Sequence, residues 1–200
     1  MEDQIRIVAS PNPIDPMKCT FEIDRPVFPD RSFFFASKER AAGSPLAEQI
    51  LAIDGVESIL VSHDRIEVAQ WSGQDWRVLG KEIGGIIREC LRSDVPPISP
   101  NVLENVLPPE QIRHVVQQVL DTQINPMVAQ HGGVIHLLDV KDNTVFIEMG
   151  GGCQGCAMSK ATLKNGVERL IREFVPEVGD ILDVTDHASG RNPYYAASES

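Results

Sequence analysis

The chain has 200 residues, of which 42% are hydrophobic, and its 18 basic and 29 acidic residues give a formal net charge of −11. An acidic chain without a basic cluster repels phosphate backbones, which argues against nucleic-acid binding. The first residues lack the basic start and apolar run of a signal peptide, and no apolar stretch has the length of a bilayer span, so a cytoplasmic protein without a membrane partner is expected. In that compartment the four cysteines are expected to be free, metal-binding or reactive rather than disulfide-bonded.

Five prolines in residues 93–109 predict a semi-rigid linker, because proline lacks a backbone N–H and is disfavoured inside helices and sheets. The linker would divide the chain into two small two-layer domains of the α/β (α+β) class, residues 1–92 and 110–187. Residues 188–200 are small and polar and are expected to form a flexible tail.

In the first domain, the turn-rich stretch SPNPIDP precedes apolar residues that alternate from Met17 to Ile23, which predicts a half-buried strand. Ser44 followed by Pro45 predicts a helix start. A second helix is expected at residues 76–91, where the interruption by Gly84 and Gly85 predicts close packing against the sheet. The remaining strands are expected at residues 32–36, 56–62 and 65–70.

The second domain begins with a helical stripe that runs from Ile112 to Met127 and is kinked at Pro126. Strands at residues 134–140 and 144–149 are expected to form a hairpin. A further helix ends before Pro176, and residues 178–184 predict a last strand. The predicted order is helix, strand, strand, cysteine loop, helix, strand.

The loop GGGCQGC, residues 150–156, places Cys153 and Cys156 between a strand end and a helix start. Glycines let the backbone turn sharply and approach a bulky ligand. The positive end of the helix, together with Lys160, would lower thiol pKa values and favour thiolates. Three chemistries fit such a pair: thiol–disulfide exchange, a zinc site and an iron–sulfur cluster.

Structural zinc sites and common clusters take four protein ligands, and this loop supplies two. Cys19 and Cys90 lie on apolar faces and are expected to be buried as small hydrophobes. A second copy of the chain could supply the missing pair across a two-fold axis. Thiol–disulfide exchange is less favoured, because the motif follows a predicted hairpin rather than lying in a βαβ unit.

The loop GGGCQGC, the following ATLKNGVERLIREFVPEV, the later DVTDH and NPYY, and the preceding HGG resemble the C-terminal domain of NifU-like (Nfu-type) iron–sulfur proteins. The resemblance covers about residues 110–195. The stretch SPNP…FASKERAAGSPLAEQILAIDGVESILVSHDRIEV resembles the N-terminal domain of many of these proteins.

This resemblance implies a carrier or scaffold rather than an enzyme. It implies that Cys153 and Cys156 of two protomers bind a shared [4Fe–4S] cluster, with [2Fe–2S] as the other cluster type, and that the protein dimerises when it binds the cluster. The implied partners are an upstream cluster-assembly scaffold and recipient apo iron–sulfur proteins. A thiol–disulfide oxidoreductase that uses the same cysteines, and a binding module with a zinc-bridged dimer interface, stay open as alternatives.

Overall fold

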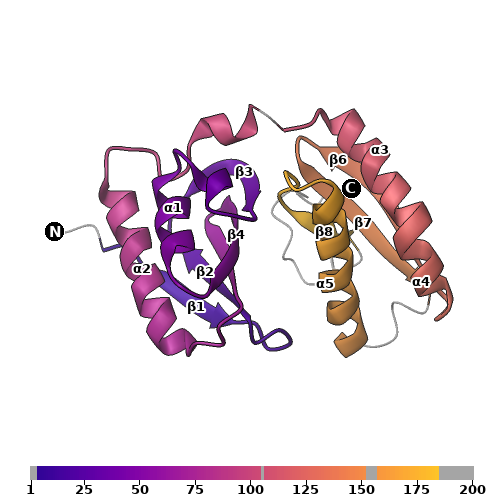
Figure 1. The fold of residues 1–200 in the computed structure, drawn as a ribbon, viewed down its shortest axis with the longest axis horizontal. Coiled ribbons are helices and arrows are strands. Elements are labelled where there is room, and N and C mark those ends of the chain that lie inside the picture. The colour runs from indigo at the N-terminus through magenta and orange to yellow at the C-terminus, as the bar shows by residue number, and fades with distance from the viewer. Residues whose placement is uncertain (1–3, 105, 152–156, 185–200) are drawn as a thin grey trace, which may run out of the picture. The chain divides into compact units, whose positions relative to one another are not determined.

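The computed structural model of the chain describes residues 4–104, 106–151 and 157–184, and of residues 157–161 only the backbone. The chain divides into two compact units between Leu107 and Pro108. Each unit packs helices against a sheet (Figure 1), which confirms the predicted mixed class. No helix within the described ranges is both long enough and apolar enough to cross a membrane.

The sheet of the first unit is antiparallel, in the order β1-β2-β5-β4-β3. Strand β1 was not predicted, because its residues after Ile7 are exposed and show no alternation of apolar and polar residues. Strand β3 begins at Phe28 rather than at Ser32, and its pairing with β4 is irregular between those residues. The strands are β1 (Ile7–Pro11), β2 (Lys18–Ile23), β3 (Phe28–Phe35), β4 (Val56–His63) and β5 (Arg65–Gln70).

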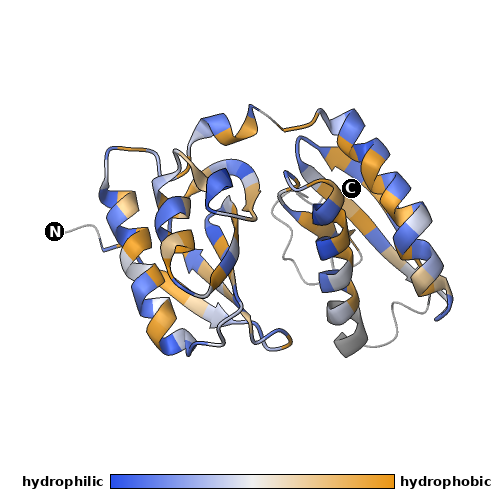
Figure 2. Cartoon of the chain, in the orientation of Figure 1, coloured by the Kyte–Doolittle hydropathy of each residue, from blue (hydrophilic) through white to orange (hydrophobic). Residues whose placement is uncertain are grey.

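Helices α1 (Pro45–Ala52) and α2 (Trp76–Arg92) lie against this sheet, and a short 3-10 helix, η1 (Glu39–Ala41), precedes α1. Apolar and polar residues alternate around α2 with helical spacing (Figure 2). Its apolar side is buried through Leu79, Ile83, Ile87 and Cys90. The predicted helices of this unit are therefore confirmed.

The proline-rich segment 93–109 differs from the expected linker, because much of it packs on the first unit. Ile98 is only 2% exposed and belongs to the core. The carbonyl oxygen of Pro97 accepts a hydrogen bond from the Leu46 N–H at 3.1 Å, and the Ser99 N–H donates to Ser44 Oγ at 3.0 Å. A proline lacks a donor but keeps its acceptor, so these contacts form despite the prolines. The segment also contains a 3-10 helix, η2 (Pro100–Leu103).

The second unit has the predicted order of elements. A five-residue π-helix, η3, follows α3, and the buried position after Ile124 is Val128. Met127, expected on the buried stripe, is 52% exposed, because the wider π turn shifts the buried face by a residue. The elements are α3 (Pro109–Val119), η3 (Leu120–Ile124), α4 (Asn125–Ala129), β6 (Gly133–Lys141), β7 (Thr144–Gly151), α5 (Ala157–Phe174) and β8 (Ile181–Asp183).

The sheet of this unit has the order β6-β7-β8. Strands β6 and β7 form the predicted antiparallel hairpin. The last strand is shorter than the expected 178–184, and it pairs with β7 in parallel. Helix α5 therefore connects two parallel neighbours, and β7, α5 and β8 form a βαβ unit.

Candidate functional site

Two glycine-rich stretches far apart in the sequence meet at one end of the β6–β7 hairpin. Gly133 pairs with Gly151, so the end of the HGG motif lies beside Gly150 and Gly151, where the cysteine loop begins. Gly151 has a φ of 64°, a conformation that side chains disfavour. A Cβ atom added there would overlap the carbonyl oxygen of Gly132. A glycine at position 151 is therefore required on both counts.

Asn125 holds the same end of the hairpin from the helical side. Its side-chain Nδ2 donates to the carbonyl oxygen of Ile135 at 3.0 Å, and the Ile135 N–H donates to Asn125 Oδ1 at 2.8 Å. Strand β6 is an edge strand, and the amide of Asn125 satisfies the backbone groups that a further strand would pair with. Asn125 thereby fixes the start of β6 two residues from Gly133. The sequence analysis missed this role of Asn125. The pair Asn125-Pro126 after a helix was the one signal that could have pointed to it.

Cys153 and Cys156 themselves lie outside the described residues, as does the rest of 152–156. The described backbone fixes both ends of their loop: it leaves β7 at Gly151 and enters the eighteen-residue helix α5 at Ala157. The first N–H groups of a helix have no partner within it, and the helix dipole makes that end positive. The expectation that this helix end favours thiolates stays a prediction, because both thiols lie outside the described residues.

The topology around this loop corrects one expectation. The sequence predicted that the motif would lie outside a βαβ unit, but the loop forms the strand-to-helix connection of the unit β7–α5–β8. Topology therefore gives no argument against thiol–disulfide exchange, which shares this setting. The choice among the three chemistries depends on other observations.

The other two cysteines are buried in the first unit, as predicted. Cys19 is fully buried and Cys90 is 4% exposed. Burial raises the pKa of the Cys19 thiol to about 11, and burial together with nearby Glu89 raises the pKa of Cys90. Both thiols stay protonated at neutral pH and are poor metal ligands.

The remaining potential ligands do not form a site either. Among the residues that the structure describes, no three or more His, Cys, Asp or Glu side chains are grouped so that they could hold a metal ion. His131 beside the glycines is exposed, and its backbone N–H donates to the carbonyl oxygen of Val128 at 3.0 Å. His187 lies outside the described residues. Within the described ranges, the cysteine loop therefore has no neighbouring ligand cluster to complete it.

Comparison with known proteins gives two family matches in the order of the two units. Residues 5–94 match the model of the scaffold protein Nfu/NifU N terminal, and residues 116–182 match the NifU-like domain. The chain is also similar to solved structures. These include the solution structure of a NifU-like protein from Saccharomyces cerevisiae, with 22% identity, 50% of this chain and 91% of that chain covered, and a TM-score of 0.43.

Relatives match across both units. The human NFU1 iron-sulfur cluster scaffold homolog, mitochondrial, is 30% identical over 179 residues, which cover 88% of this chain and 70% of the relative. A NifU-like protein of Schizosaccharomyces pombe is 30% identical, with 76% of this chain and 62% of the relative covered. The Fe/S biogenesis protein NfuA of Pseudomonas aeruginosa is 48% identical over 81 residues, 40% of this chain and 42% of the relative.

The chain spans 62% of the length of the Schizosaccharomyces pombe relative and 54% of that of a Drosophila ananassae NFU1 homolog. Both family models match in the same chain, one on each unit, and the similarity to the human relative extends through both. The chain is therefore a member of the Nfu family of NifU-like proteins.

Proposed function

We propose that this protein is an iron–sulfur cluster carrier in which Cys153 and Cys156 bind a [4Fe–4S] cluster together with the same two cysteines of a second copy. The observation that carries this proposal is a loop of two cysteines between a glycine-lined strand end and a helix start. The names of the relatives, an iron–sulfur cluster scaffold and an Fe/S biogenesis protein, support the choice of cargo.

The shared arrangement follows from the number of ligands. A [4Fe–4S] cluster takes four thiolates, and the loop of each chain offers two. A two-fold axis through the cluster supplies the second pair with the same geometry. Two positive helix ends then face the cluster and offset part of its negative charge.

A shared cluster is also easier to release than one enclosed by a single chain. Recipient thiolates replace the cysteines one after another, and each loss weakens the contact between the two copies. The protein makes and breaks no covalent bond in an organic substrate, so its role is that of a carrier and not an enzyme. The partners are an upstream scaffold that supplies the cluster and apo-proteins that receive it.

Anaerobic reconstitution with iron and sulfide tests the proposal. We expect about four irons and four sulfides per dimer, broad visible absorbance and a monomer-to-dimer shift in sedimentation. Two irons per dimer would indicate a [2Fe–2S] cluster instead. Cys153→Ser and Cys156→Ser should each abolish both the colour and the dimer.

Cys19→Ala and Cys90→Ala are the matched controls, and both should keep full iron content. Retention of iron by the two serine variants would overturn the ligand assignment. Reduction of insulin disulfides by the apo-protein would favour the oxidoreductase. Stoichiometric zinc that cluster assembly cannot displace would favour the zinc-bridged module.

A cytoplasmic location stays a prediction from composition. Cys19 and Cys90 are free thiols, which fits a reducing compartment. Several relatives are named as mitochondrial proteins. Fractionation of cells that express a tagged chain would test the location.

A further inference from the structure

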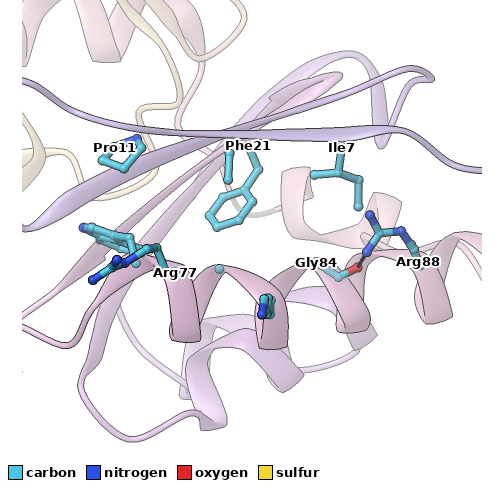
Figure 3. A pocket seen from close by; sticks show the side chains of 10 residues that line it. Ile7, Pro11, Phe21, Arg77, Gly84 and Arg88 are labelled. Atoms are coloured by element: carbon cyan, nitrogen blue, oxygen red, sulfur yellow. Dashed lines mark hydrogen bonds between the residues drawn. The ribbon is translucent and has the colours of Figure 1, made fainter.

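A groove of about 530 Å³ lies in the first unit, between helix α2 and the edge strand β1. Figure 3 shows Ile7, Pro11 and Phe21 on the strands facing Arg77, Gly84 and Arg88 on the helix. A hydrogen bond from α2 bounds the groove at each end, one to the residues before β1 and one to the turn after it. Trp76 Nε1 donates to the carbonyl oxygen of Pro16 at 2.8 Å, and Arg88 Nε donates to that of Ile5 at 3.3 Å.

Two glycines on α2 leave this space open. A Cβ atom at Gly80 would meet only the side chains of Phe21 and Ala9, at 3.8 and 3.9 Å, which is ordinary contact. The expected close packing of Gly84 and Gly85 against the sheet is wrong. A Cβ at Gly84 would lie 3.3 Å from Arg88 Nη1, a tight contact with a side chain of the same helix, and one at Gly85 would have no neighbour within 4 Å. A glycine inside a helix costs about 1 kcal/mol relative to alanine. An open groove gives a reason for that cost at Gly80 and Gly84.

The backbone of β1 can pair with a further strand. The Asp24 N–H donates to the carbonyl oxygen of Arg6 and the Asn12 N–H to that of Lys18, so the even-numbered residues of β1 point their backbone groups at β2. The alternation of an antiparallel ladder then directs the backbone groups of Ile7 and Ala9 to the open edge. No described strand pairs with that edge. Pro11 has no N–H and ends the available ladder.

The charge of the groove is opposite to that of the chain. Three of its lining residues are basic (Arg77, Lys81 and Arg88), and none is acidic, although the chain has a net charge of −11. Arg77 is already paired with Asp75 at 2.6 Å, and Arg88 also donates to the carbonyl oxygen of Gly84. The side chain of Lys81 is exposed and makes no hydrogen bond or ion pair with the described part of the chain. A ligand with carboxylates and apolar side chains would complement this surface.

We propose that this groove binds an extended segment of a partner protein, which carries both apolar and acidic residues on one face, as an added strand on the edge of β1. The main chain of the segment would pair with Ile7 and Ala9. On the face that turns toward α2, apolar side chains would enter the groove and a neighbouring carboxylate on the same face would lie near Lys81. Strand addition between an edge strand and a helix is a recurring mode of peptide recognition. The five residues of β1 set the bound length at about five residues, since a strand rises about 3.3 Å per residue.

The proposal extends the proposed function by giving the carrier a surface for a partner, but it needs no cluster. The test therefore uses the full chain without iron, and its failure would leave the cluster proposal intact. The probes are two blocked octapeptides with a fluorescent label, one in which pairs of valines alternate with pairs of glutamates and one in which they alternate with pairs of lysines, so that each face of the strand carries both residue types. Binding is followed by fluorescence anisotropy at low and moderate salt.

We expect the glutamate peptide to bind at least tenfold more tightly than the lysine peptide, and Lys81→Glu to weaken its binding at least fivefold. Gly80→Leu should fill the groove and weaken binding at least tenfold. Gly85→Leu is the matched control on the same helix, and it should change the affinity less than twofold. Circular dichroism and tryptophan fluorescence check that each variant folds.

Amide hydrogen exchange tests the binding mode. The N–H groups of Ile7 and Ala9 should exchange more slowly in the complex, while that of Val8, already directed at β2, should change little. Each of four results would overturn the proposal. The two peptides could bind equally well, or neither could bind at millimolar concentration. The two leucine variants could lose affinity equally, or exchange at Ile7 and Ala9 could stay unchanged. Self-association that Gly80→Leu abolishes would instead assign the groove to a second copy of this chain.

Discussion

Replacing Asn125 by alanine should destabilise the second unit and leave the first unchanged. The side chain of Asn125 makes two hydrogen bonds with the backbone of Ile135, at 2.8 and 3.0 Å. Ile135 is only 1% exposed, so water would replace these bonds poorly. A net hydrogen bond is worth about 1 kcal/mol, and an unsatisfied buried group adds about 1 kcal/mol or more. The sum is a loss of about 2–4 kcal/mol in the free energy of unfolding.

The position of the tryptophans provides the assay. The two tryptophans of the chain, Trp71 and Trp76, both lie in the first unit. Tryptophan fluorescence in urea therefore reports the first unit, and circular dichroism reports both. With a slope of about 1 kcal/mol per M, the transition of the second unit should move about 2 M or more toward lower urea.

The exposed Gln123, two residues before Asn125, provides the matched control as Gln123→Ala, which should move neither transition. Two results would refute the reasoning. One is an Asn125→Ala transition within 0.3 M of the original, by the slope assumed above. The other is an equal shift of the fluorescence transition, which would show that the two units do not unfold separately.

Three further predictions concern single residues. Gly151→Ala should destabilise the second unit by about 2 kcal/mol or more, because its φ of 64° and the carbonyl oxygen of Gly132 both oppose a side chain; an unchanged circular dichroism transition would contradict this. Gly80→Ala should stabilise the first unit by about 1 kcal/mol, measured by fluorescence in urea, and a loss would mean that the groove is tighter than 3.8 Å contacts indicate. Because burial raises the pKa of Cys19 from 9.0 to about 11, the Cys19 thiol ionises only in the unfolded chain between these values, so the first unit should lose up to about 2–3 kcal/mol as pH rises through that window; Cys19→Ala should remove this contribution and leave that of Cys90, whose pKa burial also raises.

The sequence predicted those elements whose signals are local. The helical spacing from Trp76 to Cys90 and the alternation from Lys18 to Ile23 depend on neighbouring residues, and both elements appear where expected. Strand β1 could not be predicted in this way, because an edge strand beside a groove buries few side chains. The prolines of segment 93–109 led to the prediction of a linker. Proline content limits the backbone conformation of the segment itself, and it does not show that carbonyl groups of the segment and Ile98 pack on the first unit.

At the candidate site, too, only the features with a local sequence signal could be predicted. The cysteine pair was evident from its spacing, but the contacts that shape its surroundings join residues far apart in sequence. Gly151 lies against Gly132, and Asn125 bonds with Ile135 across a helix-to-strand connection. A last strand was expected near β8, but its parallel pairing with β7 joins residues far apart in sequence and could not be predicted. The sequence therefore names the cysteine pair as the expected ligands, which stays a prediction, and it could not predict the contacts that shape the described ends of their loop.

The two kinds of cysteine in this chain differ in a way that bears on cluster loading. Burial raises the pKa values of Cys19 and Cys90, so these thiols keep their protons at neutral pH and do not compete for iron. The loop that contains Cys153 and Cys156 enters helix α5 at its N-terminal, positive end, and the expectation that this end favours thiolates stays a prediction. Under the proposed function, iron offered to the folded chain therefore meets two available thiolates and not four. Because two thiolates cannot complete a cluster, loading requires a second copy of the chain. Loading should therefore fail when the protein concentration is far below the dissociation constant of the dimer.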